Sequence, residues 1–72
     1  MEHAQSFCCG YVAVKSGVIK HELTDREIEK RWPQHNIDAF AQGMIDALLK
    51  DSYRYRLNKQ KLVDEGIIEI FP

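Results

Sequence analysis

Apolar residues recur at helical spacing through the first part of the chain. The set comprises Ala4, Phe7, Cys8, Tyr11, Val14 and Val18. This spacing predicts an amphipathic helix over Glu2–Ser16. Gly17 stands where a glycine in the left-handed conformation commonly ends a helix.

Two features of the same segment favour a different structure. Gly10 lies in the helix interior, where glycine costs about 1 kcal/mol relative to alanine. Several β-branched residues flank Ser16 and Gly17, so that a hairpin of residues 11–15 with residues 18–21 is the alternative. The sequence predicts helix and leaves the hairpin open.

A short second helix is marked by a capping box. Thr24 precedes Glu27 by three residues, which lets each side chain accept a hydrogen bond from the other residue's backbone N–H. Pro33 stops the helix, because the residue before a proline avoids the helical region. We predict a helix over about Asp25–Trp32, with Ile28 and Trp32 facing the core.

The strongest periodic signal follows Asn36, a favourable N-cap. The apolar residues at this spacing are Ile37, Phe40, Ala41, Met44, Ala47, Leu48 and Tyr55. They predict a long central helix over residues 37–57. Ile45 and Leu49 widen the stripe, so that we expect one side to pack on a helix and the other on a partner.

The end of the chain predicts one further helix and an extended segment. Residues 58–65 can form a short helix with Leu62 and Val63 inward and Gly66 as its C′ residue. Residues 67–71 are rich in β-branched side chains and predict a strand or extended tail. The fold class we expect is mostly α, with three or four helices. The alternative is α+β, in which an N-terminal hairpin pairs with the C-terminal strand.

The first and the central predicted helices share a short sequence pattern. Glycine follows phenylalanine by three places in both, at Phe7–Gly10 and at Phe40–Gly43. Glycine on a helix face lets a neighbouring backbone approach closely. We therefore expect these two helices to cross at Gly10 and Gly43.

The size of the chain limits what it can bury. Its 72 residues suffice for one domain only, and 44% of them are hydrophobic. A domain of this length buries roughly 60% of the surface that its unfolded chain exposes. We therefore expect some apolar surface to face a partner protein, with a second copy of the chain as one possibility.

Charge and cysteine content indicate an ordinary protein of a reducing compartment. The net charge is −1, which does not favour a globally basic nucleic-acid binder. Cys8 and Cys9 are adjacent, a spacing that strains a disulfide and does not suit zinc. No membrane-spanning stretch and no signal-peptide pattern are seen in the sequence, so that we expect a cytoplasmic protein.

The segment 50–61 is the clearest candidate for binding. It holds five basic residues and two interleaved tyrosines. They are Lys50, Tyr53, Arg54, Tyr55, Arg56, Lys59 and Lys61. Such a run is typical of a phosphate- or RNA-contacting surface, of a protein interface, or of the solvated end of a helix.

The sequence shows no pattern of catalytic, metal or cofactor chemistry. His3, His21 and His35 are isolated, and the serines have no nucleophile motif around them. The first hypothesis is a non-enzymatic adaptor, inhibitor or regulator that docks on another protein and self-associates, with no cofactor. The second is a small nucleic-acid-binding regulator that uses the basic stretch.

Overall fold

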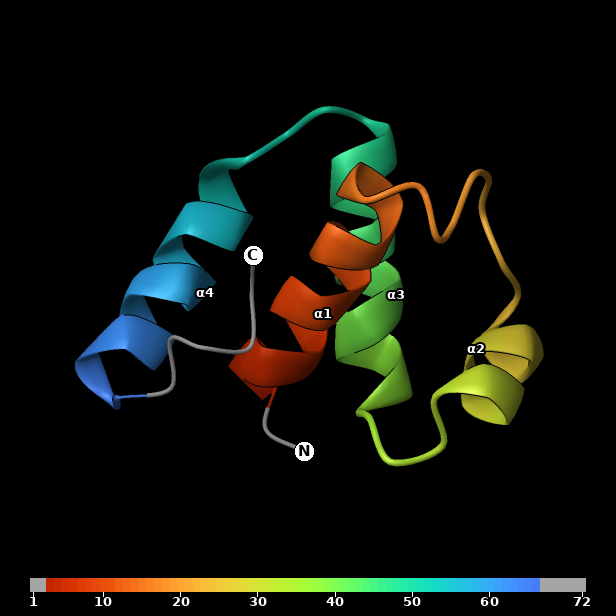
Figure 1. Cartoon of the computed structure of the whole chain (residues 1–72), viewed down its shortest axis with the longest axis horizontal. Coiled ribbons are helices and arrows are strands. Elements are labelled where there is room, and N and C mark those ends of the chain that lie inside the picture. Colours follow the sequence, from red (N-terminus) through yellow and green to blue (C-terminus); the bar gives the residue numbers. More distant parts are fainter. Residues whose placement is uncertain (1–2, 67–72) are drawn as a thin grey trace.

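The computed structural model describes residues 3–66, and over this range the chain is helical with no β-strand (Figure 1). The four helices are α1 (His3–Lys15), α2 (Asp25–Arg31), α3 (Ile37–Leu48) and α4 (Tyr53–Asp64). The mostly α fold class is therefore confirmed. The extended segment predicted for residues 67–71 lies outside the described residues.

Helix α1 is the centre of the arrangement (Figure 1). It packs most extensively against α3 and also carries α4 on another side, whereas α3 and α4 touch each other little. Helix α2 packs on α3. The fold is thus organised around one helix that contacts two others.

The N-terminal helix is confirmed and the hairpin alternative is wrong. Helix α1 runs to Lys15, and Gly17 follows it with a φ of 85°. The backbone N–H of Gly17 donates to Val14 over 3.1 Å, and that of Ile19 donates to Ala13 over 3.0 Å. This turn folds the chain back so that Ile19 is buried. Ser16 and Gly17 therefore end a helix instead of joining two strands.

The capping box of α2 is present as predicted. The amide of Glu27 donates to Thr24 Oγ1 over 3.2 Å, and the amide of Thr24 donates to Glu27 Oε1 over 3.1 Å. The helix ends at Arg31, one residue earlier than expected. Ile28 is the only buried residue of α2, and Trp32 is half-buried against Phe40.

The single long helix predicted over residues 37–57 is wrong. Asn36 caps α3 through its side chain as expected, but α3 stops at Leu48 and α4 starts at Tyr53. Lys50 adopts a φ of 61°, the left-handed conformation in which glycine is favoured. The amides of Lys50 and Asp51 donate back to Ala47 and Asp46, which closes the helix end in the Schellman pattern.

Packing on α1 explains this break. The turn at residues 49–52 returns α4 to α1, where Leu62 is fully buried with Ala4 and Cys8. A straight helix of about 1.5 Å rise per residue would carry Leu62 away from α1. Burial of one leucine side chain is worth about 2 kcal/mol, which exceeds the roughly 1 kcal/mol cost of a left-handed lysine. Leu62 faces inward as predicted, but Val63 is exposed.

The predicted crossing of α1 and α3 is confirmed at Gly10 and Gly43. Both glycines are buried, and each faces the backbone of the opposite helix. A Cβ atom on Gly10 would overlap the carbonyl oxygen of Phe40, and a Cβ atom on Gly43 would overlap that of Phe7. The contact is reciprocal, because the glycine of each helix packs against the phenylalanine carbonyl of the other helix.

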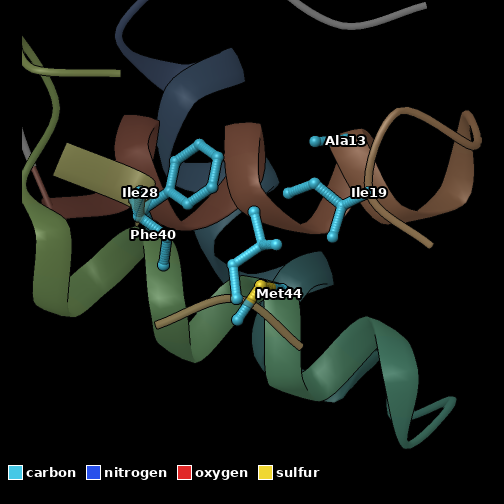
Figure 2. Packing of buried hydrophobic residues seen from close by; sticks show 6 residues of the cluster. Ala13, Ile19, Ile28, Phe40 and Met44 are labelled. Atoms are coloured by element: carbon cyan, nitrogen blue, oxygen red, sulfur yellow. The ribbon is translucent and has the colours of Figure 1, made fainter. Parts of the chain in front are cut away.

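The main core lies beside this crossing (Figure 2). Phe40 and Met44 of α3 meet Ile19 from the turn after α1 and Ile28 from α2. A second, smaller cluster joins α1 to α4. The two clusters join α1 to different helices, and within residues 3–66 neither cluster covers the far sides of α3 and α4.

We predict that Gly43→Ala destabilises the protein by about 3 kcal/mol or more, or abolishes folding. The new Cβ meets backbone atoms of Phe7, which cannot move aside as a side chain can. This cost outweighs the roughly 1 kcal/mol that alanine gains in helix propensity. Urea unfolding followed by circular dichroism measures the change.

The matched control is Gly17→Ala, where an added Cβ meets no atom and only the positive φ is unfavourable. We expect it to cost about 1 kcal/mol. A Gly43→Ala protein as stable as the unmodified chain would show that the two backbones are not in this contact.

Candidate functional site

The basic stretch predicted as a binding site does not lie on one element of the structure. Lys50 lies in the turn between α3 and α4, and the other basic residues lie on α4. At about 100° per residue, Arg54 and Lys61 share one side of α4. Arg56 and Lys59 lie toward the opposite side. The cations therefore do not form one continuous surface along the helix.

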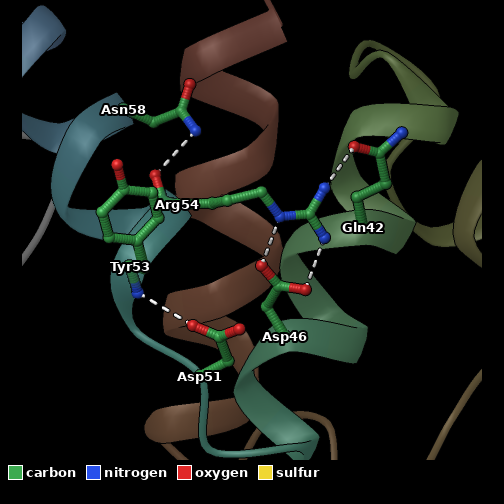
Figure 3. Close-up of polar contacts among 6 residues, drawn as sticks. All are labelled: Gln42, Asp46, Asp51, Tyr53, Arg54 and Asn58. Carbon is green, nitrogen blue, oxygen red and sulfur yellow. Dashed lines mark hydrogen bonds and ion pairs between the residues drawn. The ribbon is translucent and has the colours of Figure 1, made fainter.

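Arg54 is held by an acidic side chain of α3 (Figure 3). Its Nε donates to Oδ2 of Asp46 over 2.7 Å, and its Nη2 donates to Oδ1 over 2.5 Å. The side chain of Asp46 is only 5% exposed, whereas that of Arg54 is 48% exposed. The hydrogen bonds to Asp46 raise the pKa of Arg54 above its ordinary value. This bidentate pair is the main polar link between α3 and α4.

Two further contacts fix the guanidinium of Arg54. Its Nη1 donates to Oε1 of Gln42 over 3.2 Å, and its central carbon lies 5.3 Å from the centre of the Phe7 ring. Arg54 thereby joins α4 to α3 and to α1 at once. A residue selected from the sequence as a binding candidate is thus largely engaged in holding the helices together.

Tyr55 is also engaged within the fold. Its ring stacks on that of Tyr11 with centroids 4.0 Å apart and planes 8° apart. The ammonium of Lys59 lies 5.9 Å from the centre of the same ring. Burial raises the pKa of Tyr55. One face of this ring is therefore covered by α1 and is closed to a nucleic-acid base.

The remaining candidates point outward together with an apolar residue. Tyr53 is 61% exposed and Leu57 is 56% exposed, and the two are one helical turn apart. Arg56 and Lys61 are exposed on either side of them. We call these four residues the α4 face. Leu57 was not among the residues selected from the sequence, because a single leucine within a basic stretch gives no periodic signal.

Helix α3 presents a second exposed apolar group. Leu49 is 72% exposed, and Ile45 and Leu48 are each 36% exposed. We call these three residues the α3 face. They belong to the broad stripe seen in the sequence, whose other side packs on α1 through Phe40 and Met44. The side left over is apolar and is covered by nothing in the described part of the chain.

The structure brings together one pair that sequence reasoning missed. Ser6 Oγ lies 3.1 Å from Nδ1 of His35 and accepts a hydrogen bond from the amide of Asn36 over 2.9 Å. Residues 29 positions apart in sequence give no local signal of such a contact. Burial lowers the pKa of His35, which favours the neutral ring in this hydrogen bond.

A serine beside a histidine can act as a nucleophile with its base, but the surroundings of Ser6 and His35 indicate a structural contact. Ser6 has no exposed surface, and its oxygen already accepts a backbone N–H. A substrate carbonyl cannot approach an atom in that position. The contact ties α1 to the segment that precedes α3.

The cysteines are placed as small core residues. Cys8 is buried and Cys9 is half-buried, and both are free. Burial raises the pKa of Cys8 to about 12 and also raises that of Cys9. Because the thiolate is the reactive form, burial works against nucleophilic chemistry at both thiols.

Residues 3–66 contain no group of three or more metal-binding side chains and no cavity. None of the described helices is long and apolar enough to cross a bilayer. The two exposed apolar faces therefore remain as the candidate site.

Comparisons with known proteins give no match to this chain, whether among protein-family models, curated proteins or solved structures.

We predict that Arg54→Ala destabilises the fold by about 2 kcal/mol. It leaves the buried carboxylate of Asp46 without its partner, a situation that is costly even where the partner is half-exposed. Arg56→Ala is the control, because Arg56 is exposed on the same helix, and it should change stability by less than about 0.5 kcal/mol. Equal unfolding midpoints in urea for both variants would contradict the role of Arg54.

We also predict that stability falls as the pH drops below about 6.5, the ordinary pKa of histidine. The pKa of His35 is lowered by folding, so that the unfolded chain binds a proton more readily. Its contribution is complete above the unfolded pKa and is lost as the pH decreases.

The control for this prediction is His35→Asn, whose amide group can accept or donate in place of the ring nitrogen and does not titrate. Thermal unfolding midpoints between pH 7.5 and pH 5 should fall more steeply for the unmodified chain than for the variant. Parallel curves would assign the pH dependence to other groups.

Proposed function

We propose that this chain is a small, non-enzymatic adaptor or regulatory protein that acts by docking on another protein and that also self-associates. The observation that carries the proposal is the pair of exposed apolar faces on α3 and α4. Three of their side chains, those of Leu49, Tyr53 and Leu57, are each more than half exposed. Exposed apolar side chains that lie together commonly mark a protein interface.

The composition of the α4 face suits a protein partner. Tyrosine and arginine are enriched at the energetic centres of interfaces, and Tyr53 and Arg56 are both exposed there. Leu57 adds an apolar contact worth about 25 cal/mol for each Å² that it loses to solvent. Within residues 3–66 the ion pair is Arg54–Asp46, so that binding at Arg56 or Lys61 breaks no ion pair there.

The same geometry weighs against nucleic acid as the main partner. Arg54 and Tyr55 are engaged inside the fold, and the other cations lie on different sides of α4. A surface that follows a phosphate backbone needs several cations along one line. The nucleic-acid alternative is kept as an outcome of the experiment.

Two free thiols with raised pKa suit a reducing compartment such as the cytoplasm.

The test is affinity capture from native lysate, with and without nuclease, using the unmodified chain and Leu57→Asp. The substitution places a charge at the centre of the α4 face, at a residue that is 56% exposed and outside the core. The matched control is Val18→Asp, because Val18 is 55% exposed in the connection between α1 and α2. Both variants are first shown to be folded by circular dichroism.

We expect a stoichiometric protein that survives nuclease, is retained by Val18→Asp and is lost with Leu57→Asp. Its capture should depend weakly on salt, since apolar contacts are not screened. Recovery of nucleic acid, with steep loss as salt rises, would replace this proposal with the nucleic-acid regulator. That arm uses Arg56→Ala with Lys61→Ala, because a change at Arg54 would disturb the fold.

A further inference from the structure

The outward side of α4 follows the seven-residue repeat by which two helices pack side by side. Helix α4 lies at one edge of the described structure, with Tyr55 and Leu62 on its side toward α1 (Figure 1). These two residues are seven apart and take position f of a repeat written abcdefg. Tyr53 then falls at position d and Leu57 at position a, the positions that form the contact line between paired helices. Both side chains are more than half exposed, so that this line is open to another helix.

The positions beside this contact line are basic. Arg56 takes position g and Lys61 takes position e, so that they lie on opposite sides of the line. Among the described residues neither of them makes an ion pair. Arg54 also takes position e, but its charge is already paired with Asp46 of α3. The α4 face is therefore an apolar line with one unpaired cation on each side.

The cations of the first turn of α4 oppose the preference of an isolated helix. The N-terminal end of a helix dipole favours acids, and the C-terminal end favours cations. Helix α4 has no acid in its first turn, which holds Arg54 and Arg56, whereas it ends with Asp64 and Glu65. Residues 53–61 contain four cations and no acid. Helix stability does not account for the basic first turn, which suits an acidic partner.

We infer that the α4 face packs against an amphipathic helix of a different protein, whose apolar stripe is flanked by aspartate or glutamate. This inference rests on the proposed function and names the chemistry of its partner. Tyr53 and Leu57 pack into the apolar stripe of that helix. Arg56 and Lys61 each lie beside one of its acids, in the way that charges at positions e and g choose the partner of a paired helix.

Other occupants fit this surface less well. A second copy packed on the same two apolar residues would bring Arg56 against Arg56 or Lys61 of that copy, and like charges repel. A nucleic acid gains nothing from Leu57, and its phosphates favour cations along one line instead of cations on opposite sides. An anionic membrane would hold α4 weakly, because two apolar side chains bury little area in a bilayer.

The probes for the test are two designed helical peptides, each with leucine at positions a and d over three heptads. One carries glutamate at positions e and g, and the other carries lysine there. Fluorescence anisotropy of each labelled peptide, titrated with the full chain in about 50 mM salt, gives its affinity. We expect the acidic peptide to bind at least about tenfold more tightly, because the flanking contacts of the basic peptide are repulsive.

The reciprocal variant combines Arg56→Glu with Lys61→Glu, which makes both flanks of the α4 face acidic. It should bind the basic peptide more tightly than the acidic one, a reversal that a structural defect would not produce. The matched control combines Arg26→Glu with Lys30→Glu, because both residues are exposed on α2 and the change in net charge is the same. This control should keep the preference for the acidic peptide.

The apolar half of the contact is tested with Leu57→Asp. It should weaken the acidic peptide more than tenfold, whereas Val18→Asp, at a similarly exposed position outside α4, should not. An acidic peptide with serine in place of its leucines should bind no more tightly than the basic peptide. With only two flanking cations, the affinity for the acidic peptide should fall modestly as salt rises, in contrast to the steep loss expected for a nucleic acid.

Equal affinity for the acidic and basic peptides would overturn the inference, as would a preference that the reciprocal variant leaves unchanged. Tighter binding of a single-stranded oligonucleotide, or of vesicles rich in phosphatidylserine, would overturn it in favour of that ligand. A dimer that Leu57→Asp disrupts would assign the α4 face to a second copy.

These failures are separate from failure of the proposed function. A chain that captures a protein through Leu57 but prefers neither peptide would keep docking and lose the acidic partner. A chain that prefers the acidic peptide but captures no protein from lysate would support the inferred chemistry of the α4 face and count against the adaptor function.

Discussion

The close crossing of α1 and α3 is the contact on which the rest of this structure depends. At the crossing each helix presents a glycine to a backbone carbonyl of the other, so that the separation of the two helices is set by main-chain atoms. Side chains in contact can change rotamer, but two backbones cannot adjust in that way. The rotation of both helices about their own axes is fixed as a result.

That rotation decides where the two matching phenylalanines point and what they contact. Phe40 turns toward α2, where Trp32 and His35 lie against it. Phe7 turns toward α4, where the guanidinium of Arg54 covers its ring. Each ring is fully buried and connects the crossing to one outer helix. The position of α2 and of α4 therefore follows from the contact between α1 and α3.

The same arrangement accounts for the exposed apolar surface. Helix α1 is covered by α3 and by α4. Within the described residues, the far sides of α3 and α4 join no core. Within residues 3–66, Leu49, Tyr53 and Leu57 stay in contact with water. In the proposed function, a protein partner covers these side chains.

Features that depend on neighbours in sequence could be predicted, and features that depend on distant contacts could not. The capping box at Thr24 and the cap at Asn36 are local, and both are present. The Gly10–Gly43 approach was predicted because both glycines follow a phenylalanine by three places. The end of α3 at Leu48 could not be predicted, because a lysine in the left-handed conformation carries no helix-ending signal in the sequence. Tertiary packing of Leu62 outweighed the local preference.

The candidate site shows the same division. The sequence indicated the basic stretch at residues 50–61. It could not indicate which of these residues pack within the fold and which face solvent. Arg54 pairs with Asp46, and Tyr55 stacks on Tyr11, through contacts that only the folded chain creates. The Ser6–His35 contact joins two segments 29 positions apart for the same reason. Residue type alone indicated a surface, and the fold determines which side chains remain available on it.

Native-state hydrogen exchange at single amides is the most direct test of the central role of the crossing. The amides around Gly10 and Gly43 should be the most protected and should open together, with a free energy close to that of global unfolding. Helix α2, which buries one residue, should open at lower free energy. If the two sides of the crossing opened independently, or if α4 remained protected after they had opened, the crossing would not be the contact that organises this fold.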